Sequence, residues 1–148
     1  GQQVMRELIE NVSEHNQLGA TQELLKQIDN YGMMYDKWRL PLENQYGRAI
    51  DNFWLQEFLH HGYPFRFEGS FVHNCLVYIL SYKIWEIIIY GYIDQVGNIF
   101  TKNVFMLAIN TFSRIMDHKR KFLPIINEKA TELEKEPLKA MQMLLRLE

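Results

Sequence analysis

Apolar residues recur every three or four positions along most of this chain, which is the spacing of an amphipathic α-helix. The segments 21–39, 42–60 and 101–118 show this pattern most clearly, each with charged or amide side chains on its opposite face. No alternating apolar and polar run of useful length occurs, so nothing predicts a β-strand. The pattern therefore indicates an all-α protein.

Prolines and glycines predict where these helices are interrupted. Pro41 is expected to start a new helix, and Pro124 is expected to break another, because proline lacks the amide proton that a helix interior needs. Residues 62–70 read as the one long connection. Gly91 and Gly97 are expected to bracket a short turn.

The most apolar segment runs from residue 71 to residue 93 and is long enough to be considered as a membrane span. Lys83 and Glu86 lie near its middle, and each central charge costs roughly 2.5 to 3.5 kcal/mol on insertion. A buried helix at the centre of a bundle is the better interpretation. The two charges, three residues apart, are expected to pair and to reach the bundle surface or a polar seam with Asn74 and Ser81.

These patterns predict a single-domain, all-α bundle of five or six helices around a central, nearly all-apolar helix at about 71–90. At 148 residues the chain is long enough for one domain with a real core. It begins without Met, and its last helical pattern, which follows Pro137, has no glycine cap. We therefore expect residues 1–148 to be a single domain excised from a longer protein. Whether an N-terminal signal or membrane anchor was removed is left open by the sequence.

Charge and cysteine content exclude several functions. The formal net charge is −2, with 16 basic and 18 acidic residues, so no positive face for DNA or RNA is indicated. Cys75 is the one cysteine, which rules out an internal disulfide or a CxxC motif. No motif calls for a cofactor, and the compartment stays open. The short basic run 118–121 leaves contact with anionic lipid as an alternative.

Histidines cluster where the helix of residues 42–60 ends. Glu57 and His60 form a Glu-x-x-His pair, and His61 and His73 lie close enough in the sequence to join them as metal ligands. A di-iron site needs a second Glu-x-x-His, and the chain has none. The favoured interpretation is a polar helix end, with the two adjacent histidines near its carbonyl groups.

Aromatic residues suggest a second candidate site. Most aromatics at helical spacing form core, but tyrosines also carry hydroxyl groups that need partners, and an apolar cavity with polar tips is typical of a ligand pocket. The candidate ligand-binding residues are Tyr63, Tyr78, Tyr82 and Trp85.

The function that these observations favour is a non-enzymatic interaction or sensory domain of a larger protein. A protein partner or self-association is expected, and the last helix offers an apolar stripe of Leu138, Met141, Leu144 and Leu145 unless that stripe closes the bundle. The alternatives are a small-molecule sensor with an aromatic pocket and a metal-binding helical protein.

The two interpretations of the histidines differ in one measurement. From the helix-end interpretation we expect native mass spectrometry of the chain, purified without chelator, to give an apo mass, and His60→Ala/His61→Ala to lower stability only slightly. A bound ion that disappears in the double variant would instead establish the metal site.

Overall fold

The computed structural model describes residues 2–16, 26–60, 62, 65, 69–95, 101–117 and 119–146. These residues form helices joined by turns, and no strand occurs among them. The predicted all-α bundle around a central apolar helix is confirmed. The helices are α1 (Gln2–Asn16), α3 (Tyr31–His60), α4 (Phe71–Gln95), α5 (Lys102–Asp117), α6 (Lys119–Leu133) and α7 (Pro137–Arg146).

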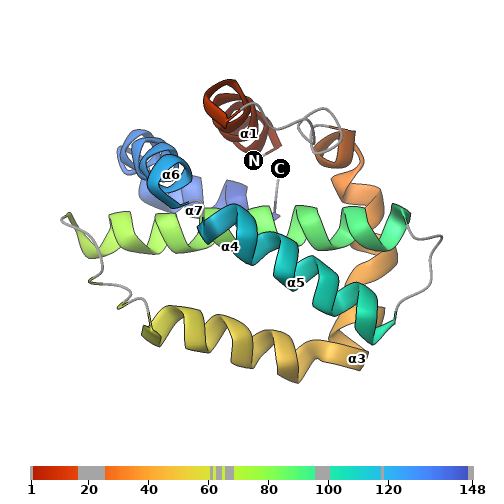
Figure 1. Ribbon diagram of the computed structural model, residues 1–148. Helices are drawn as coiled ribbons and strands as arrows, with labels where there is room; N and C mark the ends of the chain where they lie inside the picture. Colours follow the sequence, from red (N-terminus) through yellow and green to blue (C-terminus); the bar gives the residue numbers. More distant parts are fainter. Residues whose placement is uncertain are drawn as a thin grey trace.

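Helix α4 is the central element, and α1, α3, α5, α6 and α7 all pack against it (Figure 1). Among the described residues it is the one helix that is long and apolar enough to cross a membrane. In the 18-residue stretch of α4 that is apolar enough to cross a membrane, 78% of the residues are buried inside the bundle. A helix surrounded by neighbours needs apolar side chains on all its sides, which explains why α4 lacks a polar face.

Side chains and turns define where the helices begin and end. The Ser70 hydroxyl accepts a hydrogen bond from the His73 amide (3.0 Å), and the Thr101 hydroxyl accepts one from the Val104 amide (3.3 Å). These are N-cap contacts at the starts of α4 and α5. Gly62 follows the end of α3 with a φ of 74°, a conformation that glycine adopts without strain.

Pro41 does not separate two helices, and this expectation was wrong. Helix α3 continues through it from Tyr31 to His60. The proline removes one backbone hydrogen bond and its ring crowds the preceding turn, which bends a helix without having to end it. Figure 1 shows that α3 changes direction sharply along its length. Trp38 and Leu42, on either side of the proline, are buried and hold both arms of the bent helix on the core.

Two further interruptions were also predicted wrongly. Pro124 lies inside α6, where the burial of Ile126 and Ala130 in the core outweighs one lost hydrogen bond. Gly91 lies inside α4, which runs on to Gln95, whereas Gly97 is outside the described residues. A side chain on Gly91 would collide with Gln27, so the glycine permits a close approach between the segment before α3 and α4.

The central position of α4 leads to a test of stability. Leu80→Ala, which truncates a fully buried α4 side chain, should lower the free energy of unfolding by about 2 to 5 kcal/mol in urea denaturation. The matched control is Leu59→Ala on the 67% exposed side chain of α3, which should change it by at most about 0.5 kcal/mol. Equally small losses would contradict the placement of α4 at the centre of the core.

Candidate functional site

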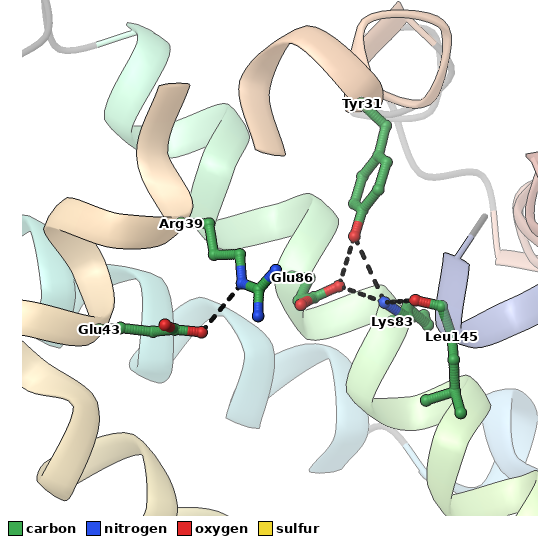
Figure 2. A network of polar contacts seen from close by, with 6 residues as sticks. All are labelled: Tyr31, Arg39, Glu43, Lys83, Glu86 and Leu145. Atoms are coloured by element: carbon green, nitrogen blue, oxygen red, sulfur yellow. Dashed lines mark hydrogen bonds and ion pairs between the residues drawn. The ribbon is translucent and has the colours of Figure 1, made fainter. Parts of the chain in front are cut away.

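A buried charged network occupies the middle of α4. The Lys83 Nζ lies 2.8 Å from Glu86 Oε2, and both side chains are almost fully buried. Tyr31 of α3 donates its hydroxyl to the same carboxylate oxygen (2.6 Å) and accepts a hydrogen bond from Lys83 (3.3 Å). The backbone carbonyl of Leu145 in α7 is the third acceptor for Lys83, at 3.5 Å (Figure 2). The network therefore joins α3, α4 and α7.

The network accounts for the hydrogen-bonding capacity of Lys83. An ammonium group has three donors, and here it has three acceptors from three helices. Burial, together with the charge and hydrogen bond of Glu86, raises the pKa of Tyr31, so its phenol stays protonated and can donate to the carboxylate. Lys83 is thus held in one position and is inaccessible to solvent.

The sequence predicted the pairing of Lys83 and Glu86 but not its location. The pair does not reach the bundle surface or the polar seam, because Tyr31 covers it from α3. Asn74 and Ser81 instead hydrogen-bond to backbone carbonyls of Ser70 and Val77.

A pocket of about 70 Å³ lies between the bent helix α3 and α4. It combines carboxylates, one guanidinium group, aromatic rings and aliphatic side chains. The lining residues are Arg39, Leu42, Glu43, Gly47, Ile50 and Asp51 from α3, and Tyr82, Trp85, Glu86 and Tyr90 from α4. Glu86 belongs to both the pocket and the buried network.

The charges of the pocket are unevenly balanced. Three carboxylates line it against one guanidinium, and Arg39 Nε already pairs with Glu43 Oε1 at 3.1 Å (Figure 2). The guanidinium also lies over the Tyr35 ring, 5.1 Å from its centroid. Burial, followed by the charge of Glu86, raises the pKa of both Tyr82 and Tyr90, so both phenols are neutral. The lining carries an excess of negative charge.

Two of the four predicted ligand-binding residues line this pocket. Tyr82 and Trp85 do so, and the Trp85 Nε1 is buried without a hydrogen-bond partner among the residues that the structure describes. Tyr78 lies elsewhere, since it donates its hydroxyl to the Trp54 carbonyl (2.9 Å). Tyr63 is outside the described residues. Ligand binding by this set stays a prediction.

The predicted metal ligands are not seen together. Glu57 is half-buried and His60 is exposed, whereas His61 lies outside the described residues. His73 is buried, and its ring nitrogens face Asn127 Oδ1 (2.9 Å) and Glu134 Oε2 (3.5 Å). In the part of the chain that the structure describes, no three histidine, cysteine, aspartate or glutamate side chains could hold one ion.

His73 instead links two helices. Its contacts connect the start of α4 to Asn127 in α6 and to Glu134, which follows α6. The Ser70 hydroxyl also donates a hydrogen bond to Glu134. Because His61 is not described, the four-residue metal site stays a prediction.

The apolar stripe of the last helix is divided between the core and the surface. Leu144 is fully buried and Met141 packs partly against the core, since α7 lies against α4. Leu138 and Leu145 are exposed. The stripe therefore helps to close the bundle, while two of its leucines remain on the outside.

Sequence reasoning missed the α3 side of the pocket. Glu43, Gly47 and Asp51 follow one another at four-residue spacing, which places them in one row along a helix. That row lies beside the buried Leu42 and Ile50. Its combination of two acids and a glycine next to apolar residues was the sequence feature that could have indicated a pocket. A solvated helix face would have the same pattern.

The buried network leads to a prediction about stability. Lys83→Met should lower the free energy of unfolding by about 3 to 5 kcal/mol, because it leaves Glu86 buried without its counter-charge. The triple variant Tyr31→Phe/Lys83→Met/Glu86→Met should lose less than this single variant. Lys139→Met is the control, because its pair with Glu136 is exposed and worth about 0 to 1 kcal/mol. Urea unfolding measures all three, and a loss for Lys83→Met no larger than the control's would contradict the role of the network.

Comparison with known proteins places this arrangement in a family. No curated protein and no solved structure matches the chain. The family described as the FliB lysine N-methylase C-terminal domain matches residues 2–145, which include the pocket between α3 and α4 and all of the described helices except the last residue of α7. This chain belongs to the FliB lysine N-methylase C-terminal domain family.

Proposed function

We propose that this chain is a non-catalytic helical domain of a lysine N-methylase, and that it holds the protein on which the enzyme acts. The family description supplies the reaction and names a C-terminal domain of the enzyme. A methylase that modifies a side chain of a protein must hold a macromolecule as well as a methyl donor.

The observation that carries this proposal is the way in which the buried lysines are used. The ammonium group of Lys83 donates hydrogen bonds to Glu86, to Tyr31 and to the Leu145 carbonyl. Lys129 of α6 is similarly bound to Glu7 of α1 (2.6 Å) and to Glu132 (3.0 Å). These groups connect helices, which supports a scaffold rather than a centre for acid–base or nucleophilic chemistry.

Two further features agree with a domain that does not transfer the methyl group. Burial raises the pKa of the Cys75 thiol, which disfavours the reactive thiolate. The pocket between α3 and α4, at about 70 Å³, is well below the roughly 300 Å³ at which sites for larger organic ligands begin. It can hold the end of a side chain, but not a nucleoside-sized methyl donor.

Calorimetric titration of the chain tests the proposal with two probes. We expect S-adenosylmethionine, a nucleoside-sized methyl donor, to give no binding heat. We expect an unstructured peptide with several lysines to bind, and its counterpart with norleucine in place of lysine to bind more weakly. Binding of the donor, or no binding of the lysine peptide, would overturn the proposal.

A further inference from the structure

We propose that the pocket between α3 and α4 is a binding site for the ammonium end of a lysine side chain. This inference rests on the proposed function, and it names the group that the domain recognises and the residues that recognise it. The charge, the aromatic walls and the size of the pocket support this ligand, and each of them is independent of the family match.

The charge of the lining favours a cation. Glu43, Asp51 and Glu86 contribute three carboxylates, against the single guanidinium of Arg39. Lys83, behind Glu86, compensates one more charge and still leaves an excess of one negative charge. An anionic ligand would therefore meet net repulsion, whereas an incoming ammonium group supplies the missing positive charge.

Arg39 does not itself supply the missing positive charge. Its Nε is paired with Glu43, and its guanidinium is stacked over Tyr35, a residue that does not line the pocket. The guanidinium of Arg39 is thus already engaged by Glu43 and by the Tyr35 ring. Asp51 and Glu86 remain as the carboxylates available to a ligand.

The aromatic walls suit an ammonium group for a second reason. Tyr82, Trp85 and Tyr90 line the pocket, and the faces of such rings attract cations. The protein already contains an ammonium group in the same kind of surroundings: Lys83 Nζ lies 5.7 Å from the ring centroids of both Tyr31 and Tyr82, with Glu86 as its counter-charge. The pocket repeats this chemistry on the side of Tyr82 and Glu86 that faces α3.

The size of the pocket limits the ligand to the tip of a side chain. A cavity needs roughly 10 to 15 Å³ of this kind of space to hold one water molecule, so about 70 Å³ admits an ammonium group and its last methylene groups. Gly47 contributes to this space, because a Cβ at that position would have no atom within 4 Å. Because Gly47 lines the pocket, a larger side chain at this position is expected to narrow it.

The test uses the indole N–H signal of Trp85, a residue that lines the pocket and whose Nε1 has no hydrogen-bond partner in the described part of the chain. In ¹⁵N-labelled chain, the signal is assigned by its loss in Trp85→Phe. Nα-acetyl-lysine methylamide should shift it in a saturable manner, and the norleucine analogue, which lacks the ammonium group, should bind about tenfold more weakly.

Matched variants show whether the binding occurs in this pocket. Gly47→Leu should abolish the lysine-dependent shift, whereas Gly32→Leu, at another position of α3 with open space, should leave it unchanged. Asp51→Asn should weaken binding by about two- to fivefold, and Asp36→Asn, also exposed on α3 but outside the pocket, should not. Both glycine variants must retain the helical circular dichroism of the parent chain.

Two results would overturn the inference. One is equal binding of the lysine and norleucine compounds, and the other is undiminished lysine binding in a folded Gly47→Leu variant. If the lysine peptide still binds the chain in either case, the domain recruits protein through another surface and the proposed function stands. If the lysine peptide does not bind at all, the proposed function fails with it.

Discussion

The rest of this structure depends on the burial of one ammonium group. Taking a lysine out of water costs several kcal/mol unless a counter-charge and hydrogen-bond acceptors replace the solvent. Lys83 obtains them from Glu86 on its own helix, from Tyr31 on α3 and from the Leu145 carbonyl on α7. Because these acceptors must arrive together, the network ties the positions of α3 and α7 on α4 to one another. Apolar packing alone would favour contact between these helices but would specify their register less strictly.

The same network prepares the pocket. Glu86 uses Oε2 for both Tyr31 and Lys83, yet the residue also lines the space between α3 and α4. Its carboxylate is therefore kept in place at the wall of the pocket by contacts that have a structural purpose. A group held in this way loses little further freedom when a ligand binds, which favours recognition. Stability and binding cannot be separated at Glu86, whereas Gly47 and Asp51 belong to the pocket side alone.

Helical periodicity was sufficient to predict what each helix buries, but not what it contacts across the bundle. The segment 21–39 was expected to be an amphipathic helix, and its apolar residues Ile28, Tyr31 and Trp38 are buried, whereas Tyr35 is half-buried. The pairing of Lys83 with Glu86 followed from a spacing of three residues. Tyr31 completes that pair from 52 residues away in the sequence, and His73 likewise finds Asn127 on α6 rather than the neighbouring end of α3. Such contacts depend on how the helices pack, which a local pattern does not contain.

The wrong prediction at Pro41 and the missed side of the pocket have one cause. A proline that ended one helix and began another would have released Arg39 and Glu43 from a common helical register. Because α3 continues through Pro41, these two residues stand four apart on one face, and Arg39 Nε lies 3.1 Å from Glu43. That pair engages the guanidinium of Arg39, and the row continues through Gly47 to Asp51. The bend left by the proline sets this row against Tyr82, Trp85 and Glu86 of α4. The carboxylates of Glu43 and Asp51 thus line the pocket because α3 continues as one helix through Pro41.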